Sequence, residues 1–123
     1  MLSHLSFGVA DLARAGAFYD AALRPLGYVR VWDGEHGIGY GPPGGNDKLA
    51  LFAQDGQVSP PGPGFHLALT APTRAAVDAF HAAALQMGGR DDGAPGLRPD
   101  YSPTYYAAFV IDPDGYKLEA VHQ

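Results

Sequence analysis

The chain has 123 residues, 46 % of them apolar, so it can bury a core as one domain or as two small fused halves. Its net charge of −5, without a basic stripe, argues against nucleic acid as a partner, and the lack of cysteine excludes disulfides, thiolate nucleophiles and cysteine-ligated zinc. No signal peptide and no apolar run of about 20 residues is visible, so we expect a cytoplasmic protein without a membrane partner.

The first half of the chain predicts one strand, one helix and three further strands. Residues 2–9 alternate between apolar and less apolar side chains, which predicts a half-buried strand with His4 on its less apolar face. Asp11 is a suitable N-cap for a helix that runs to Leu23 and ends before Pro25 and Gly27. Further strands are expected at 28–32, 37–41 and 48–52.

The same order of elements then starts again. Residues 54–64 are rich in proline and glycine and are expected to be a linker. A strand at 65–70 carries His66 at its head, and Thr73 caps a helix that ends at Gly88-Gly89. A polar, glycine-containing stretch at 90–103 can hold a short strand. Strands at 105–111 and 116–121 are predicted to form a hairpin around Asp112-Pro113-Asp114-Gly115.

The two halves are similar at the residue level. An offset of 62 (66 − 4) aligns His4-Leu5 with His66-Leu67, and one of 69 (117 − 48) aligns Lys48-Leu49-Ala50-Leu51 with Lys117-Leu118-Glu119-Ala120. A repeat of this kind fixes the architecture. We therefore predict a single α+β domain, 1–123, with one βαβββ module at about 1–53 and another at about 65–123. The two modules should form a curved mixed sheet around a concave pocket, with the helices outside.

The repeat also predicts a metal site. His4 and His66 begin equivalent strands, and Glu119 is a carboxylate between apolar neighbours, where a charge is unfavourable unless it is paired. Two imidazoles and a carboxylate suit one divalent ion (Zn, Fe, Ni, Mn or Co) and leave positions open for substrate. The position equivalent to Glu119 is Ala50, which has no donor atom. The expected site therefore has three protein ligands and open coordination.

The predicted hairpin suggests which side chains lie beside the carboxylate. If residues 112–115 form a simple turn, Ala108 faces Glu119 and Tyr106 faces Val121. Tyr106 would then line the pocket and could donate a proton. A bulge at the turn would bring Tyr105 there in its place.

These residues resemble the vicinal oxygen chelate superfamily, which includes glyoxalases, bleomycin-resistance proteins and ring-cleaving dioxygenases. The resemblance covers the whole chain and is carried by His4-Leu5-Ser6-Phe7, His66, and the run from Asp112-Pro113-Asp114-Gly115 to Glu119. It implies paired βαβββ modules, a divalent metal at His4, His66 and Glu119, and chemistry in which the metal polarises oxygens of a bound substrate.

The expected function is that of a metalloenzyme acting on vicinal oxygens of a small molecule, as an isomerase, lyase or dioxygenase. Ala50 replaces a second glutamate that glyoxalase I uses as a ligand, which argues against lactoylglutathione lyase activity. The alternative is a binding protein that sequesters a small molecule, as bleomycin-resistance proteins do. The side chains expected to line the substrate pocket are Ser6, Phe52, Tyr101 and Tyr106. We also expect the protein to form a homodimer. The sequence leaves open whether His4 and Glu119 meet within one chain or across that dimer.

Overall fold

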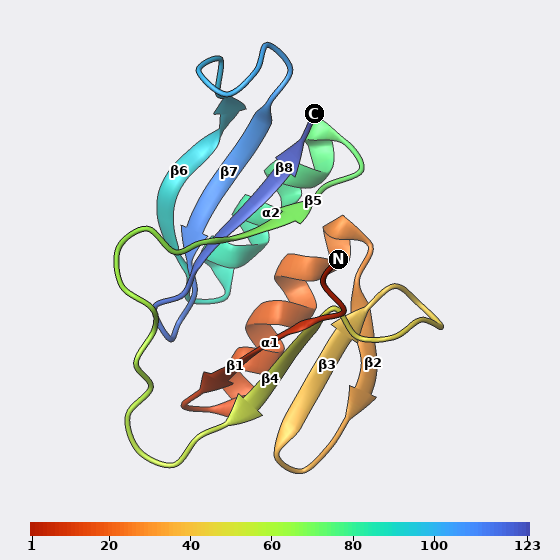
Figure 1. The fold of residues 1–123 in the computed structure, drawn as a ribbon, viewed down its shortest axis with the longest axis vertical. Helices are drawn as coiled ribbons and strands as arrows, with labels where there is room; N and C mark the ends of the chain where they lie inside the picture. Colours follow the sequence, from red (N-terminus) through yellow and green to blue (C-terminus); the bar gives the residue numbers. More distant parts are fainter.

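The computed structural model describes residues 1–123 and confirms the α+β fold with two modules (Figure 1). The first module contains β1 (Leu5–Val9), α1 (Leu12–Leu23), the short 3-10 helix η1 (Arg24–Leu26), β2 (Val29–Asp33), β3 (Gly37–Gly41) and β4 (Leu49–Ala53). The second contains β5 (Leu67–Thr70), α2 (Arg74–Gln86), β6 (Arg90–Leu97), β7 (Tyr106–Ile111) and β8 (Lys117–His122).

Each module forms its own four-stranded mixed sheet. The strand orders are β1-β4-β3-β2 and β5-β8-β7-β6, and in each sheet the first strand pairs in parallel with the last strand of the same module. The registers are equivalent as well: Ser6 pairs with Ala50, and Ala68 pairs with Glu119. Since Ser6 lies two residues after His4 and Ala68 two after His66, Ala50 holds in the first module the place that Glu119 holds in the second.

The helices begin and end at the signals in the sequence. The side chain of Asp11 accepts a hydrogen bond from the Arg14 amide, and that of Thr73 accepts one from the Ala76 amide. Each helix covers one face of its sheet with buried apolar residues, among them Phe18 on α1 and Phe80 on α2. The other face of each sheet, here called its open face, carries no helix. Neither helix is long and apolar enough to cross a membrane.

The two sheets stay separate within the chain because the modules meet through their helices. Helix α1 packs against α2, and Figure 1 shows the two helices side by side at the centre of the molecule. One core cluster of 21 buried residues runs through both modules. The open faces therefore do not close a concave pocket on one another inside a single chain.

The turn between β7 and β8 forms a second junction between the modules. Asp112 accepts a hydrogen bond from the Tyr19 hydroxyl of α1, and Asp114 accepts bonds from the Ala10 amide and from Arg14. The Tyr116 hydroxyl donates to the Gly8 carbonyl of β1. This aspartate-rich turn connects the second module to the first. The Asp112-Pro113-Asp114-Gly115 part of the sequence motif therefore has a structural role.

Candidate functional site

The site is built around Glu119 on β8, which is buried although it points to the open face. Its side chain is 1 % exposed, and its Oε1 lies 2.9 Å from His66 Nε2, while the imidazole itself is 43 % exposed. His66 precedes β5 by one residue and lies two before Ala68, the partner of Glu119, so both side chains are on the same face. The buried carboxylate and the accessible imidazole are two potential metal ligands, and they converge from neighbouring strands.

The second carboxylate oxygen is held by a tyrosine. The Tyr105 hydroxyl donates a 2.6 Å hydrogen bond to Glu119 Oε2. Burial, the hydrogen bond and the negative charge of Glu119 raise the pKa of Tyr105 to about 12. Tyr105 is thus a donor at neutral pH, and it fixes which oxygen of Glu119 faces His66. The Tyr101 ring packs edge-on against Tyr105, with centroids 5.0 Å apart, at the rim of the same site.

The hairpin register differs by one residue from the simple-turn prediction. Glu119 pairs with Phe109 and Tyr106 pairs with His122, so Ala108 does not face Glu119. Tyr106 lies on the helix side, where its hydroxyl donates to Asp78 of α2 at 2.6 Å and its pKa is raised by that bond. The expectation that Tyr106 lines the pocket beside Glu119 is therefore wrong. Tyr105, the alternative for a bulged turn, is the tyrosine that reaches the carboxylate.

The third expected ligand, His4, stays apart from this pair. It is exposed at the start of β1, and its Nδ1 lies 3.0 Å from the Ser3 hydroxyl. No group of three histidine or carboxylate side chains that could hold a metal comes together within the chain. Strand parity still places His4 on the open face of its own sheet, together with Ser6 and Ala50.

An accessible cavity of about 450 Å³ lies directly beside His66. Its wall is formed by the proline- and glycine-rich linker and by Lys117 on β8. The Lys117 ammonium lies 5.0 Å from the centre of the Phe109 ring, and His66 contacts the same ring edge-on. The linker thus lines a cavity that reaches the exposed His66 imidazole.

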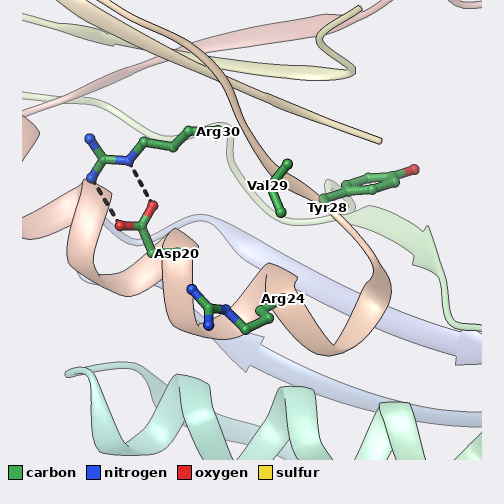
Figure 2. Close-up of a pocket in the computed structure, with 5 residues that line it drawn as sticks. All are labelled: Asp20, Arg24, Tyr28, Val29 and Arg30. Atoms are coloured by element: carbon green, nitrogen blue, oxygen red, sulfur yellow. Dashed lines mark hydrogen bonds and ion pairs between the residues drawn. The ribbon is translucent and has the colours of Figure 1, made fainter. Parts of the chain in front are cut away.

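A second concavity, on the outer surface of the first module, has its main cation already paired (Figure 2). Its volume is about 180 Å³, and Arg30 there binds both carboxylate oxygens of Asp20, at 2.7 and 3.1 Å. Arg30 also contacts Asp33 at 3.0 Å, and these bonds raise its pKa. The concavity lies on the helix side, away from Glu119, and the charge of Arg30 is used for structure.

The family model for the Glyoxalase/Bleomycin resistance protein/Dioxygenase superfamily matches residues 1–120. The chain belongs to this superfamily. The matched range includes His4, His66 and Glu119. No curated protein matches the chain.

Solved structures of the superfamily share this fold over the whole chain. A glyoxalase/bleomycin resistance protein from Albidiferax ferrireducens T118 is 34 % identical, with 100 % of this chain and 99 % of that chain covered and a TM-score of 0.87. A glyoxalase-related enzyme from Fulvimarina pelagi is 18 % identical (100 % and 88 % covered, TM-score 0.76). The fosfomycin resistance protein FosX from Mesorhizobium loti is 17 % identical (100 % and 92 % covered, TM-score 0.70). The last two likenesses concern the fold alone.

The sequence did not indicate that Trp32 lies on an open face. Glu119 lies on the corresponding face of the second sheet of this superfamily member. Trp32, at the end of a predicted strand, lies over β3 on the open face of the first sheet, beside Phe52. The alternating glycines of β3 were a usable signal, because they leave the surface there without side chains. The bulge that turns Trp32 to this face has no clear mark in the sequence.

Proposed function

We propose that this superfamily member is a homodimeric metalloenzyme that acts on a small molecule carrying vicinal oxygens. The observation that carries the proposal is the buried Glu119 carboxylate, 2.9 Å from the accessible His66 imidazole. Imidazole nitrogen and carboxylate oxygen are suitable ligands for a divalent ion of the Zn, Fe, Ni, Mn or Co type. The residues present therefore fit the metal that the family implies.

We further infer that the third ligand is His4 of a second copy. Within one chain the modules meet through α1 and α2, which keeps His4 away from the pair. The open faces also leave large apolar side chains exposed, among them Trp32 and Phe52. Two copies arranged with twofold symmetry would cover the open face of each first module with that of a second module. That arrangement brings His4 to the pseudo-equivalent position opposite His66 and Glu119.

Each residue then has a defined task. A divalent ion at this site supplies Lewis acidity to the oxygens of a bound substrate. Glu119 and His66 bind it, and Tyr105 holds Glu119 in one orientation and keeps its proton at neutral pH because its pKa is raised to about 12. Ala50, in place of a second carboxylate, leaves the first-module side of the pocket without a base. Proton transfer of the isomerase or lyase kind would therefore use a group of the substrate or bound water as the base.

Metal binding tests this proposal directly. Wild-type protein, stripped with chelator and titrated with zinc by calorimetry, should bind one ion per chain, and Glu119→Ala or His4→Ala should lose that binding. His81→Ala is a matched control, since His81 pairs with Asp91 on the outer side of the second module. If the wild type binds no divalent ion, or if Glu119→Ala binds zinc as well as the wild type, the metalloenzyme proposal fails. A chain that binds small molecules equally without metal would be a sequestering protein.

A further inference from the structure

The cavity beside His66 has walls that favour negative charge. His66 and Lys117 are the ionisable side chains that line it, and no carboxylate does. The other lining residues are glycines, prolines and Phe65. Its volume of about 450 Å³ is within the usual range of small-molecule sites. The proposed metal site uses the His66 imidazole, which leaves Lys117 without a task there.

Lys117 is held at the edge of this cavity by two neighbours. It lies two residues before Glu119 on β8, so its side chain is on the same open face. Its Nζ lies 3.1 Å from Asp92 Oδ2 and 5.0 Å from the centre of the Phe109 ring. These contacts position the ammonium, which still has further N–H donors to offer. Because Lys117 and Asp92 are each 40 % exposed, their ion pair is weak and can share the ammonium with a second anion.

The linker side of the cavity supplies backbone donors. Residues 62–65 form a tight turn in which the Phe65 amide donates to the Gly62 carbonyl, and Gly64 has a φ of +97°. The amides of Gly62 and Gly64 donate to no backbone carbonyl of the chain, and both glycines line the cavity. Free N–H groups in a turn with a left-handed residue form a common kind of anion site. Glycine also lets a ligand oxygen approach the backbone closely.

We propose that this cavity binds an oxyanion group of the substrate, a carboxylate or a phosphate, through the Lys117 ammonium and the free amides of the 62–65 turn. The inference rests on the proposed function, because the vicinal oxygens would lie at His66 and Glu119 while the charged group occupies the adjacent cavity. An oxyanion only accepts hydrogen bonds, and this wall offers charged and neutral N–H donors without a repelling carboxylate. The site therefore selects substrates that carry a negative charge beside their vicinal oxygens.

Small anions test the cavity without any need for metal. The full-length chain, with no zinc added, is titrated with inorganic phosphate and separately with succinate, and its backbone amides are followed by NMR. The Gly62 and Gly64 signals should shift saturably with at least one of these anions, and that anion identifies the group preferred. Neutral succinamide should leave both signals in place.

Lys117→Met removes the charge and keeps most of the stem, so it should weaken anion binding about tenfold or more. Lys48→Met is the matched control, because Lys48 is the equivalent residue of the first module and is exposed. Asp92→Asn gives an independent test that keeps the ammonium. It removes the competing partner of Lys117 and should strengthen anion binding about twofold or more.

Three results would overturn the inference: no saturable shift at the two glycines, equal weakening by Lys48→Met, or weaker anion binding in Asp92→Asn. Zinc titrations separate this inference from the proposed function. Lys117→Met should still bind one zinc ion per chain, and Glu119→Gln should lose zinc but keep its anion affinity within about twofold. A wild type that binds zinc but neither anion refutes the oxyanion site alone. A wild type that binds an anion through Lys117 but no zinc refutes the metalloenzyme and leaves the anion site standing.

Discussion

Single residues decide how the buried carboxylate is held. Glu119 is almost fully enclosed, yet both oxygens are satisfied, one by His66 and the other by Tyr105. An unpaired buried carboxylate oxygen would be strongly unfavourable, so the tyrosine stabilises the ionised form that a cation requires. Residues that orient a metal ligand commonly affect affinity almost as much as the ligands do.

Tyr105→Phe should weaken zinc binding by about 10- to 100-fold, because Glu119 loses the donor that fixes its Oε2. Tyr106→Phe is the matched control: it removes the same hydroxyl one residue away, where the partner is Asp78. Calorimetric zinc titrations at pH 7 compare the two. Because the raised pKa of Tyr105, about 12, keeps its proton in place, the loss should be the same at pH 6 and pH 8. A larger effect for Tyr106→Phe would contradict this assignment.

Asp112 makes stability depend on pH in the opposite direction from a paired surface carboxylate. Burial raises its pKa above the ordinary value of about 4, despite hydrogen bonds from Tyr19 and from two backbone amides that lower it. A carboxyl with a raised folded-state pKa stabilises the fold most below its unfolded pKa, and that contribution declines as pH rises through the folded pKa. The groups around it are Tyr19, Asp114 and, through Asp114, Arg14.

Asp112→Asn should therefore gain stability relative to the wild type as pH rises from about 3.5 to 7. Urea denaturation across this range measures the difference in free energy of unfolding at each pH. Asp55→Asn, an exposed linker substitution, corrects for the change in net charge. A difference that stays flat with pH, or one that reverses, would show that the buried carboxyl does not titrate between the two states as inferred.

At the scale of elements, most of the fold could be predicted because its signals are local. The caps Asp11 and Thr73, the alternating strands and the terminal glycines all act within a few residues, and α1 begins and ends where the pattern indicates. The register of the last hairpin could not be predicted in this way. Ile111 pairs with Lys117, so Tyr116 falls in the turn, where its hydroxyl binds Gly8 and its ring stacks on Phe7.

That missed register explains the error about Tyr106. A contact across more than 100 residues draws Tyr116 out of the strand, and every side chain of β7 shifts by one relative to β8. The His66–Glu119 pair depended less on such detail, because His66 follows from the repeat and Glu119 is a carboxylate between apolar neighbours. How the modules of one chain sit on each other depends on helix packing, which leaves no motif in the sequence.

Gly39→Ala should displace the tryptophan of the first sheet. The added methyl would lie 2.0 Å from the indole nitrogen, so the Trp32 ring must move away from β3 and become more solvated. We expect a red shift of the tryptophan emission and a loss of about 1–3 kcal/mol in the free energy of unfolding. Gly62→Ala is the control, since a methyl there meets nothing within 4 Å. An unchanged emission spectrum in Gly39→Ala would mean that the indole does not rest on β3.

At the scale of the whole molecule, the two modules are joined through helices and a turn, which leaves both open faces available. In the proposed dimer, these two faces of one chain would form halves of two different pockets, each completed by the second copy. A twofold dimer would use each chain twice, once for its first module and once for its second, and would create two identical sites.

Mixed dimers test this arrangement. His4→Ala and Glu119→Ala homodimers should each lack zinc, but a heterodimer purified through two different tags should regain about half of the wild-type zinc content, because one of its two sites has every ligand. Mass spectrometry of metal per dimer gives the measurement. Pairing His66→Ala with Glu119→Ala is the control that should recover nothing, since the proposal places both residues of each pair on one chain. Failure of the first heterodimer to regain zinc would refute a site shared between copies.

Equivalent positions of the two modules hold Ala50 and Glu119, and this difference affects how such a protein can evolve. In the proposed dimer the second module carries most of the chelating groups, and the first carries mainly shape: glycines, a methyl group and an indole. Substitutions in the first module can then alter which molecules are accepted without disturbing the chemistry. A carboxylate at position 50 as well as at 119 would couple these two properties. With alanine at position 50, the proposed dimer keeps selectivity for shape and reactivity in different modules of a single short chain.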